Sequence, residues 1–274
     1  MQERKESIWT EQCIRWAHVG APTRPTSEDS AIMIQLAKSC LSEIEEPNIS
    51  VLGVTPEIIQ LDWPSQTKLY AFDSSADMIK KWWRQNKKID SKVFLSDWKH
   101  LPVVNGSMNM ILGDGSFTAL QSVEEHQSVI SEIDRVLQKN GYLIMRCFIR
   151  PDKKETVNQI KKDVETNKIQ NFGTLKWRIA MALTDPKTST VQPSYIYNIF
   201  HETFKDLSKL TRHNHWSRDL ISTLDSYANM TGFFTFLTEA SLKKYMLKNI
   251  KFLSKKTGNY ELAERCPTIL FKKI

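Results

Sequence analysis

Five short apolar runs in the first 150 residues, each followed by a turn, constrain the fold more than any other feature of the sequence. They are strand-length, rich in β-forming residues, and lie at 49–54, 68–72, 92–96, 108–113 and 141–148. Segments with apolar residues three and four positions apart lie between several of them, as at 124–137, which is typical of amphipathic helices. Because strands that alternate with helices form covered parallel sheets, we expect an α/β fold with a doubly wound, mostly parallel sheet.

The pattern changes after Arg150-Pro151. Residues 153–247 show mostly helical periodicity, and we expect no strand among them. Two more strand-like runs follow at 249–253 and 266–273, and their short connection predicts an antiparallel hairpin that completes a seven-stranded sheet. The expected organisation is an N-terminal helical cap at 1–48, a core at 49–150 and 248–274, and a helical lid or substrate insertion at 151–247.

The composition is that of a globular protein and narrows the range of partners. No stretch approaches the roughly 18 consecutive apolar residues that a membrane span needs, so we expect no membrane partner. The net charge of +7 would suit an anionic partner, but the lysines are spread in short pairs, which makes nucleic acid the less favoured choice. The four cysteines form no C-x-x-C pair, so we expect no metal site and a cytoplasmic location.

An ordered set of residues follows the first four runs: Gly53, Asp73, Asp97 and Asp114. In doubly wound sheets, ligands bind at the carboxyl ends of the strands, near the point where the strand order reverses. Asp73 follows Gly53 by about 20 residues, a spacing at which an acidic side chain reaches the two hydroxyls of a ribose. A carboxylate can accept hydrogen bonds from both hydroxyls. This set therefore predicts a ligand that contains a nucleoside.

The loop Gly53-Val-Thr-Pro-Glu57 argues against a dinucleotide. A pyrophosphate binds a glycine-rich turn with free backbone N–H groups at a helix N-terminus. Two of the expected glycines are missing here, and Pro56 removes one N–H group, although it suits a helix that Thr55 would cap. Glu57 also places a negative charge where a phosphate would lie. S-adenosylmethionine carries no phosphate and has a cationic sulfur, so this loop is compatible with it.

The chain resembles the class I S-adenosylmethionine-dependent methyltransferases over nearly its whole length, outside the helical insertion. The resemblance rests on Leu52-Gly-Val-Thr-Pro-Glu, Tyr70-Ala-Phe-Asp-Ser-Ser-Ala-Asp-Met-Ile, Leu95-Ser-Asp-Trp, Met110-Ile-Leu-Gly-Asp-Gly-Ser and Ile133-Asp-Arg-Val-Leu-Gln-Lys-Asn-Gly-Tyr-Leu-Ile. It implies a Rossmann-like methyltransferase with S-adenosylmethionine as cofactor. The contacts that it implies are Gly53, Thr55 and Glu57 for the methionine part, Asp73 for the ribose, Met78, Asp97 and Trp98 for the adenine, Asp114 and Gly115 near the sulfonium, and Ser74 as a further cofactor contact.

Several of these residues also have an ordinary structural interpretation. Asp73 and Asp97 are typical of helix caps and turns, and Met78 is typical of a core position. Arg24 precedes a helix predicted after Ser27, where it could bind a carboxylate of cofactor or substrate, and a plain surface position is equally consistent. The histidines that could act as a general base are not distinguished by spacing, so the catalytic group stays open: His100, His126, His201, His213 and His215.

The insertion is the segment where an acceptor pocket would be built, and it is rich in aromatic residues that also suit a helical core. The chain lacks the Asn-Pro-Pro-Tyr and Pro-Cys segments of enzymes that methylate nucleic-acid bases. A small-molecule acceptor, with oxygen or nitrogen as nucleophile, is therefore the first hypothesis. Two alternatives stay open. Because Val51, Thr55 and Glu57 depart from the usual loop pattern, the domain could be an inactive binding module, and because the chain is basic, it could be an RNA methyltransferase.

Overall fold

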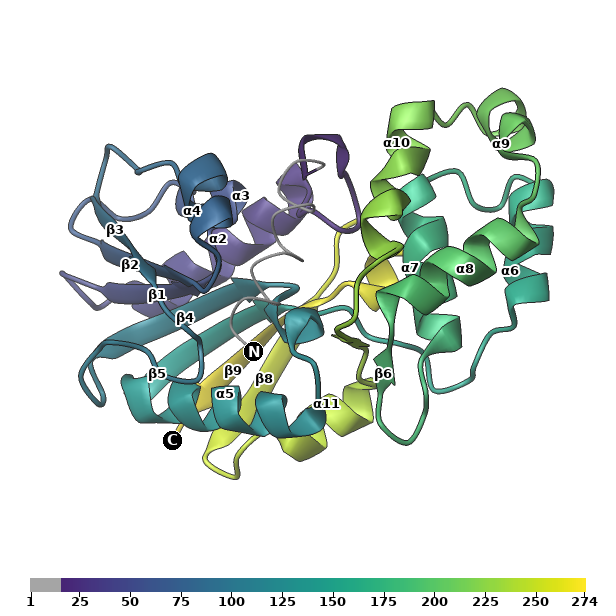
Figure 1. Ribbon diagram of the computed structural model, residues 1–274. Coiled ribbons are helices and arrows are strands. Elements are labelled where there is room, and N and C mark those ends of the chain that lie inside the picture. Colours follow the sequence, from purple (N-terminus) through teal and green to yellow (C-terminus); the bar gives the residue numbers. More distant parts are fainter. Residues whose placement is uncertain (1–15) are drawn as a thin grey trace.

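The computed structural model describes residues 16–274, and its centre is a seven-stranded sheet (Figure 1). The strands are β1 (Asn48–Leu52), β2 (Lys68–Asp73), β3 (Asp90–Leu95), β4 (Met108–Asp114), β5 (Leu137–Arg146), β8 (Ile250–Lys256) and β9 (Thr268–Lys273). Their order in the sheet is β3-β2-β1-β4-β5-β9-β8. β1 to β5 are parallel, whereas β9 pairs antiparallel with both β5 and β8. The predicted doubly wound, seven-stranded sheet with a C-terminal antiparallel hairpin is confirmed.

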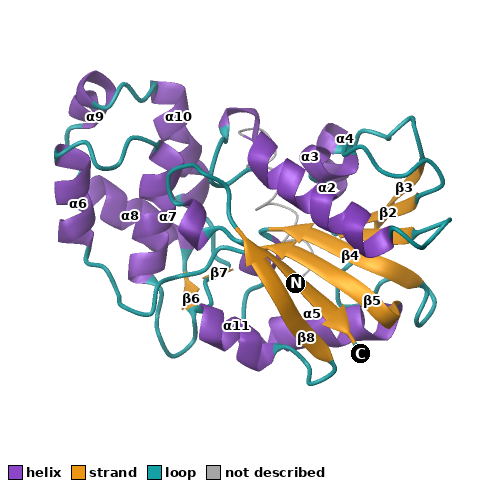
Figure 2. Ribbon diagram, turned by 180° about the vertical axis from the view of Figure 1, so that it is seen from behind, coloured by secondary structure: helices purple, strands orange, loops and turns teal. Residues whose placement is uncertain are grey.

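Helices cover both faces of this sheet. The helices are α2 (Ser27–Leu41), α3 (Pro56–Ile59), α4 (Ala76–Trp82), α5 (Val123–Val136), α6 (Val157–Glu165), α7 (Phe172–Leu183), α8 (Pro193–Thr203), α9 (Leu207–His213), α10 (Arg218–Ser222) and α11 (Glu239–Tyr245), with short 3₁₀ helices η1 (Trp16–His18), η2 (Ser116–Ala119), η3 (Thr223–Tyr227) and η4 (Ala263–Arg265). One apolar cluster joins α2, α3 and α4 to the sheet, and another joins α5 and α11 to its opposite face. Figure 2, which views the molecule from behind, shows α2 lying across the face of the sheet that is turned toward the reader. Because both faces are covered, β4 is apolar along most of its length.

Local capping explains where α2 and α4 begin. The side chain of Thr26 accepts a hydrogen bond from the backbone N–H of Asp29, and the Asp29 carboxylate accepts one from the backbone N–H of Thr26. This capping box starts α2. Ser75 starts α4 by accepting from the backbone N–H of Met78 at 3.2 Å. Pro56 begins α3 as predicted, but Thr55 makes no side-chain capping bond there, so that part of the prediction is wrong.

The helices α6 to α10 gather beyond the ends toward which the arrows of β4 and β5 point (Figures 1 and 2). They enclose an apolar cluster of their own, which contains most of the aromatic residues noted in the sequence. The expectation of no strand in this region is wrong, because β6 (Thr190–Val191) and β7 (Phe234–Thr235) form a small antiparallel pair. A strand of two residues is too short to be recognised from the alternation of apolar and polar residues. Thr235 fixes this pair to the sheet domain through a hydrogen bond of 2.5 Å from its hydroxyl to the Leu120 carbonyl.

The chain leaves the sheet after Arg146 and returns to it at Ile250. The division into a cap, a core and an insertion stays a prediction, and the part of the predicted cap at 1–15 lies outside the described residues. Between Trp16 and Ile274, every helix is too short or too polar to cross a lipid bilayer.

Candidate functional site

The first strand ends in a turn that only glycine adopts easily. Gly53 has φ of +110°, a conformation that side-chain-bearing residues rarely take. Its backbone N–H donates to the carbonyl of Phe72 at 2.7 Å, which holds the turn against the end of β2. The following loop therefore lies next to the residues that follow β2.

Asp73 ends β2 with a partly buried carboxylate. Its Oδ1 accepts from the backbone N–H of Ser75 at 2.9 Å, and no cationic side chain pairs with it in the described part of the chain. Burial raises the pKa of Asp73 from 3.8 to about 6, although the backbone N–H groups of Ser75 and Val54 act in the opposite direction. A buried carboxylate with only neutral donors around it suits a ligand that brings hydroxyl groups.

The loop after β3 presents one polar and one aromatic side chain. Asp97 is about half exposed, accepts from the backbone N–H of Lys99 at 3.0 Å, and lies 3.3 Å from the Lys99 ammonium. Trp98 donates its indole N–H to the carbonyl of Phe72 at 2.7 Å. This bond fixes the indole ring beside the ends of β1 and β2.

Asp114 ends β4 within a buried network around Arg146. Arg146 is fully buried and donates to Asp114 Oδ1 at 2.5 Å and to the carbonyl of Pro22 at 2.8 Å. Asp29 lies 3.8 Å from the same guanidinium. Burial alone would lower the pKa of Arg146, but the attraction of Asp114 outweighs it and raises this pKa. The network ties the segment before α2 to the strand ends.

Gly115 allows the chain to pass close to an aromatic ring at this point. It has φ of +62°, and a Cβ atom there would lie 2.6 Å from the ring of Phe148. A larger residue would therefore push on Phe148, which lines the same pocket.

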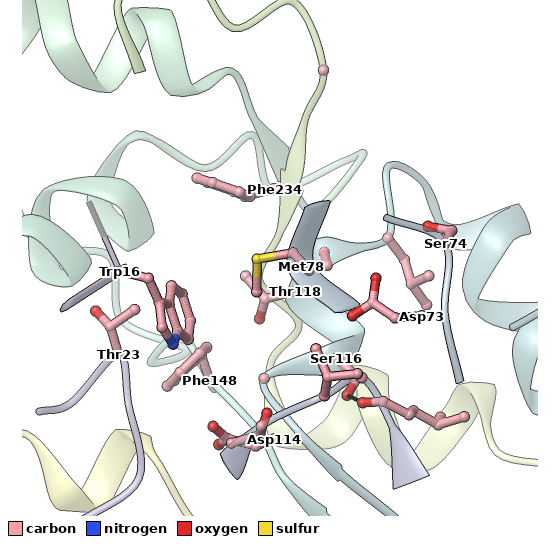
Figure 3. A pocket seen from close by; sticks show the side chains of 18 of the residues that line it. Trp16, Thr23, Asp73, Ser74, Met78, Asp114, Ser116, Thr118, Phe148 and Phe234 are labelled. Atoms are coloured by element: carbon pink, nitrogen blue, oxygen red, sulfur yellow. Dashed lines mark hydrogen bonds between the residues drawn. The ribbon is translucent and has the colours of Figure 1, made fainter. Parts of the chain in front are cut away.

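These strand ends meet around one pocket (Figure 3). Figure 3 shows Asp73 and Ser74 on one side of it and Trp16 and Thr23 on the opposite side, with Met78 and Thr118 between them. The structure brings most of the predicted contact residues to its wall, namely Gly53, Thr55, Asp73, Ser74, Met78, Asp97, Trp98, Asp114 and Gly115.

Two predicted residues, Glu57 and Arg24, are not part of this wall and contact each other instead. Arg24 Nε donates to Glu57 Oε1 at 2.9 Å, and the guanidinium lies 5.6 Å from the centroid of the Trp82 ring. The carboxylate that Arg24 contacts here thus belongs to the protein. The pair also offsets the negative charge of Glu57, while Glu57 Oε2 is buried without a partner among the described residues.

The opposite wall comes from residues that the sequence patterns did not single out as a site. Phe148 follows β5, and Lys176, Trp177, Tyr227 and Phe234 belong to the helical region and its small strand pair. The aromatic members pack on one another, with ring centroids of Trp177 and Phe148 separated by 5.0 Å. The aromatic density of 151–247 was the available signal, but it did not show which rings face the strand ends.

No histidine of the described region lines this pocket. His100 and His215 are exposed, and His126 is fully buried in α5 against Phe117, with neither ring nitrogen bonded to a described residue. The described residues also contain no group of three or more His, Cys, Asp and Glu side chains that could hold a metal ion. A general base in the pocket would therefore have to come from another residue type or from the acceptor itself.

Acidification is expected to destabilise the protein through His126. Burial lowers the pKa of His126 from 6.5 to about 4. Between these values the unfolded chain binds a proton that the folded protein does not, so stability falls as the pH falls through this range. Relative to pH 7.5, the wild type should lose roughly 2–3 kcal/mol more than His126→Leu at pH 4.5 in urea unfolding. The exposed His100→Leu is the control, and equal losses in all three proteins would contradict the prediction.

One sequence comparison finds a similarity within the sheet region. Residues 53–145 match the family model described as a methyltransferase domain. A search among curated proteins gives no match.

Solved structures show the same fold at low sequence identity. A Rhodobacter sphaeroides protein, provisionally described as one of the zinc-dependent alcohol dehydrogenases, is 12% identical with a TM-score of 0.59, covering 96% of this chain and 99% of its own. The N-methyltransferase NodS from Bradyrhizobium japonicum WM9, in complex with S-adenosyl-L-homocysteine, is 8% identical with a TM-score of 0.50, covering 96% and 98%. Residues 53–145 are therefore similar to a methyltransferase domain, and the chain has the fold of the N-methyltransferase NodS.

Proposed function

We propose that this protein is an active methyltransferase that transfers the methyl group of S-adenosylmethionine to a small-molecule acceptor. The observation that carries the proposal is the two-sided pocket. One wall holds the strand-end residues, among them Asp73 and Asp114, and the other holds aromatic residues of the helical region, among them Trp177 and Tyr227. A concave, mostly apolar site with a few polar groups is the usual form of a small-molecule site.

The residues of the sheet wall suit the parts of the cofactor. Asp73 would accept from the ribose hydroxyls, and its burial without a cationic partner fits neutral donors better than a phosphate. Trp98 and Met78 offer apolar contacts for the adenine, with Asp97 beside them. The loop at Gly53 would contact the methionine part, and Asp114 and Gly115 would lie near the sulfonium.

The chemistry asks little of the protein beyond binding and orientation. The sulfonium supplies an activated methyl group, and the pocket residues align the acceptor atom with it and exclude water. The helices α6 to α10 would act as the lid of this pocket, because Lys176, Trp177 and Tyr227 reach its wall from them and from the adjoining η3. Oxygen or nitrogen would be the attacking atom.

Calorimetric titration with S-adenosylhomocysteine and with S-adenosylmethionine is the first test of this function. We expect saturable binding of both with one site per chain. Release of S-adenosylhomocysteine from S-adenosylmethionine in the presence of pooled small molecules then measures turnover. Absence of binding at millimolar cofactor would contradict the enzyme function and favour a binding module. Turnover that requires RNA, and that decreases as the salt concentration rises, would instead indicate that the acceptor is RNA.

A further inference from the structure

Lys176 is a buried cation in the wall of the pocket. It lies in α7, where most neighbouring side chains are apolar, and only 5% of its surface is exposed. Its ammonium lies 5.6 Å from the centroid of the Trp177 ring and 5.4 Å from that of Tyr227. Aromatic faces attract a cation, but they replace only part of its hydration.

Lys176 has no acidic partner among residues 16–274, whereas the next cation in the same helix has two. Arg178 donates to Glu155 and to Asp163, each at 2.6 Å. No such bond or ion pair involves the Lys176 ammonium. Because buried charges are normally paired, an unpaired one in a pocket wall points to a partner that the ligand supplies.

The carboxylates that line the pocket have other contacts. Asp114 is bound by Arg146, Asp97 and Glu125 contact Lys99, and Asp73 accepts from backbone N–H groups. None of them is close enough to Lys176 to form an ion pair in the described structure. The charge of Lys176 is thus available to a bound anion.

Two further residues that line the pocket carry a polar side-chain atom without a partner in the described structure. Trp177 Nε1 and Thr23 Oγ1 are buried and have no hydrogen-bond partner in the part of the chain described. The indole N–H can only donate, the hydroxyl can donate, and the Lys176 ammonium has three protons to donate. A carboxylate accepts through both oxygens, so it suits the Lys176 ammonium better than a neutral group does.

We propose that Lys176 binds a carboxylate of the methyl acceptor, so that the substrate is an apolar small molecule bearing an acidic group. This inference rests on the proposed function, because it assigns the chemistry of the same pocket. The surrounding rings of Phe148, Tyr227 and Phe234 would hold the apolar part of such an acid.

The charge state of Lys176 fits this role. Burial lowers the pKa of Lys176 to about 8, with no neighbouring group acting against it. The ammonium is still the main form at pH 7, and pairing with a carboxylate would favour it further.

The cofactor also carries a carboxylate, so the two sources of this group must be separated. The predicted contacts of the methionine part lie at the Gly53 turn on the sheet wall, whereas Lys176 projects from a helix of the opposite wall. We therefore assign Lys176 to the acceptor. A variant without this ammonium should keep its affinity for S-adenosylhomocysteine.

The experiment uses protein saturated with S-adenosylhomocysteine and three probe acids, phenylacetate, indole-3-acetate and hexanoate, each compared with its neutral amide by calorimetry. We expect at least one acid to bind the wild type at least tenfold more tightly than its amide. Lys176→Met should reduce that preference to less than threefold, and Lys176→Arg should retain part of it. Lys187→Met, an exposed lysine in the turn after α7, should behave as the wild type.

Three results would overturn the proposal. One is the absence of any acid preference in a wild type that binds S-adenosylhomocysteine, and another is an unchanged preference in Lys176→Met. The third is a tenfold loss of S-adenosylhomocysteine affinity in Lys176→Met, which would assign the ammonium to the cofactor. Failure of the wild type to bind S-adenosylhomocysteine would instead refute the proposed function.

Thermal unfolding completes the test, because loss of an unpaired buried charge should not lower the melting temperature, whereas loss of a purely structural lysine should.

Discussion

Asp73→Ala is expected to lower the affinity for S-adenosylhomocysteine by about tenfold to hundredfold. This corresponds to roughly 1.5–3 kcal/mol, the usual contribution of hydrogen bonds to a charged group. The effect should be large because the carboxylate lies in the pocket wall with no other charged partner in the described region, so no neighbouring side chain can replace it. Calorimetric titration measures the change directly.

The pH dependence of binding distinguishes the carboxylate from a general packing effect. Because burial raises the pKa of Asp73 to about 6 in the free protein, this group becomes protonated as the pH falls below that value. The ribose hydroxyls prefer the ionised form, so affinity should fall as the pH falls through 6, approaching a tenfold loss per pH unit. Asp73→Asn keeps an oxygen for the Ser75 N–H but cannot ionise, so it should lose this pH dependence.

Two controls make the Asp73 result specific. Asp90→Asn changes an exposed carboxylate at the amino end of β3. Leu95, which pairs with Asp73, lies at the other end of the same strand. The Asp90→Asn variant should bind S-adenosylhomocysteine as the wild type does. Asp73→Asn should be at least as stable as the wild type at pH 8, since a buried carboxylate with a raised pKa opposes folding when ionised. Unchanged affinity in Asp73→Ala would mean that the ribose lies elsewhere.

The sheet wall of the pocket could be predicted because it depends on local patterns. A short apolar run predicts a strand, and the residue that follows it lies at the carboxyl end of that strand, so Gly53, Asp73, Asp97 and Asp114 were expected to converge. The structure places them on one pocket. Their roles toward the cofactor are predictions that the titrations above would test.

The helical wall could not be predicted because its contacts join segments far apart in the sequence. Lys176 is about 100 residues from the end of β2, and nothing in the pattern of α7 shows that one turn of it reaches the strand ends. The signals available in the sequence were the aromatic density of 151–247 and a lysine in a mostly apolar helical segment. Local patterns do not predict the pairing of Arg24 with Glu57, because 33 residues separate them. They do not predict the pairing of the two-residue strands β6 and β7 for the same reason.

Arg146 shows how a pattern can suggest exposure where the structure has complete burial. A charged residue at the end of β5 would ordinarily lie in solvent. Here it is fully buried because two acidic side chains, Asp29 and Asp114, come from α2 and β4 to the same point. The carbonyls of Pro22 and Thr23 accept its other protons, at 2.8 and 3.3 Å. The guanidinium therefore joins the segment before α2 to the floor of the pocket.

Arg146→Met is expected to destabilise the protein by about 3–5 kcal/mol in urea unfolding. Removal of one partner leaves the other charge buried and unpaired, and here two carboxylates would lose their cation. Lys38→Met removes an exposed ion pair with Asp62 and should change stability by less than about 1 kcal/mol.

Paired variants separate the charge effect from simple loss of packing. Asp114→Asn combined with Arg146→Met should recover part of the lost stability, since one of the unpaired carboxylates is then neutral. Arg146→Lys keeps the charge but not the forked geometry, so it should fall between the wild type and Arg146→Met. Because Asp114, Gly115 and Thr23 also line the pocket, Arg146→Met should weaken S-adenosylhomocysteine binding even where the protein is still folded. A loss below 1 kcal/mol, or no recovery in the double variant, would show that this buried network does not hold the pocket floor in place.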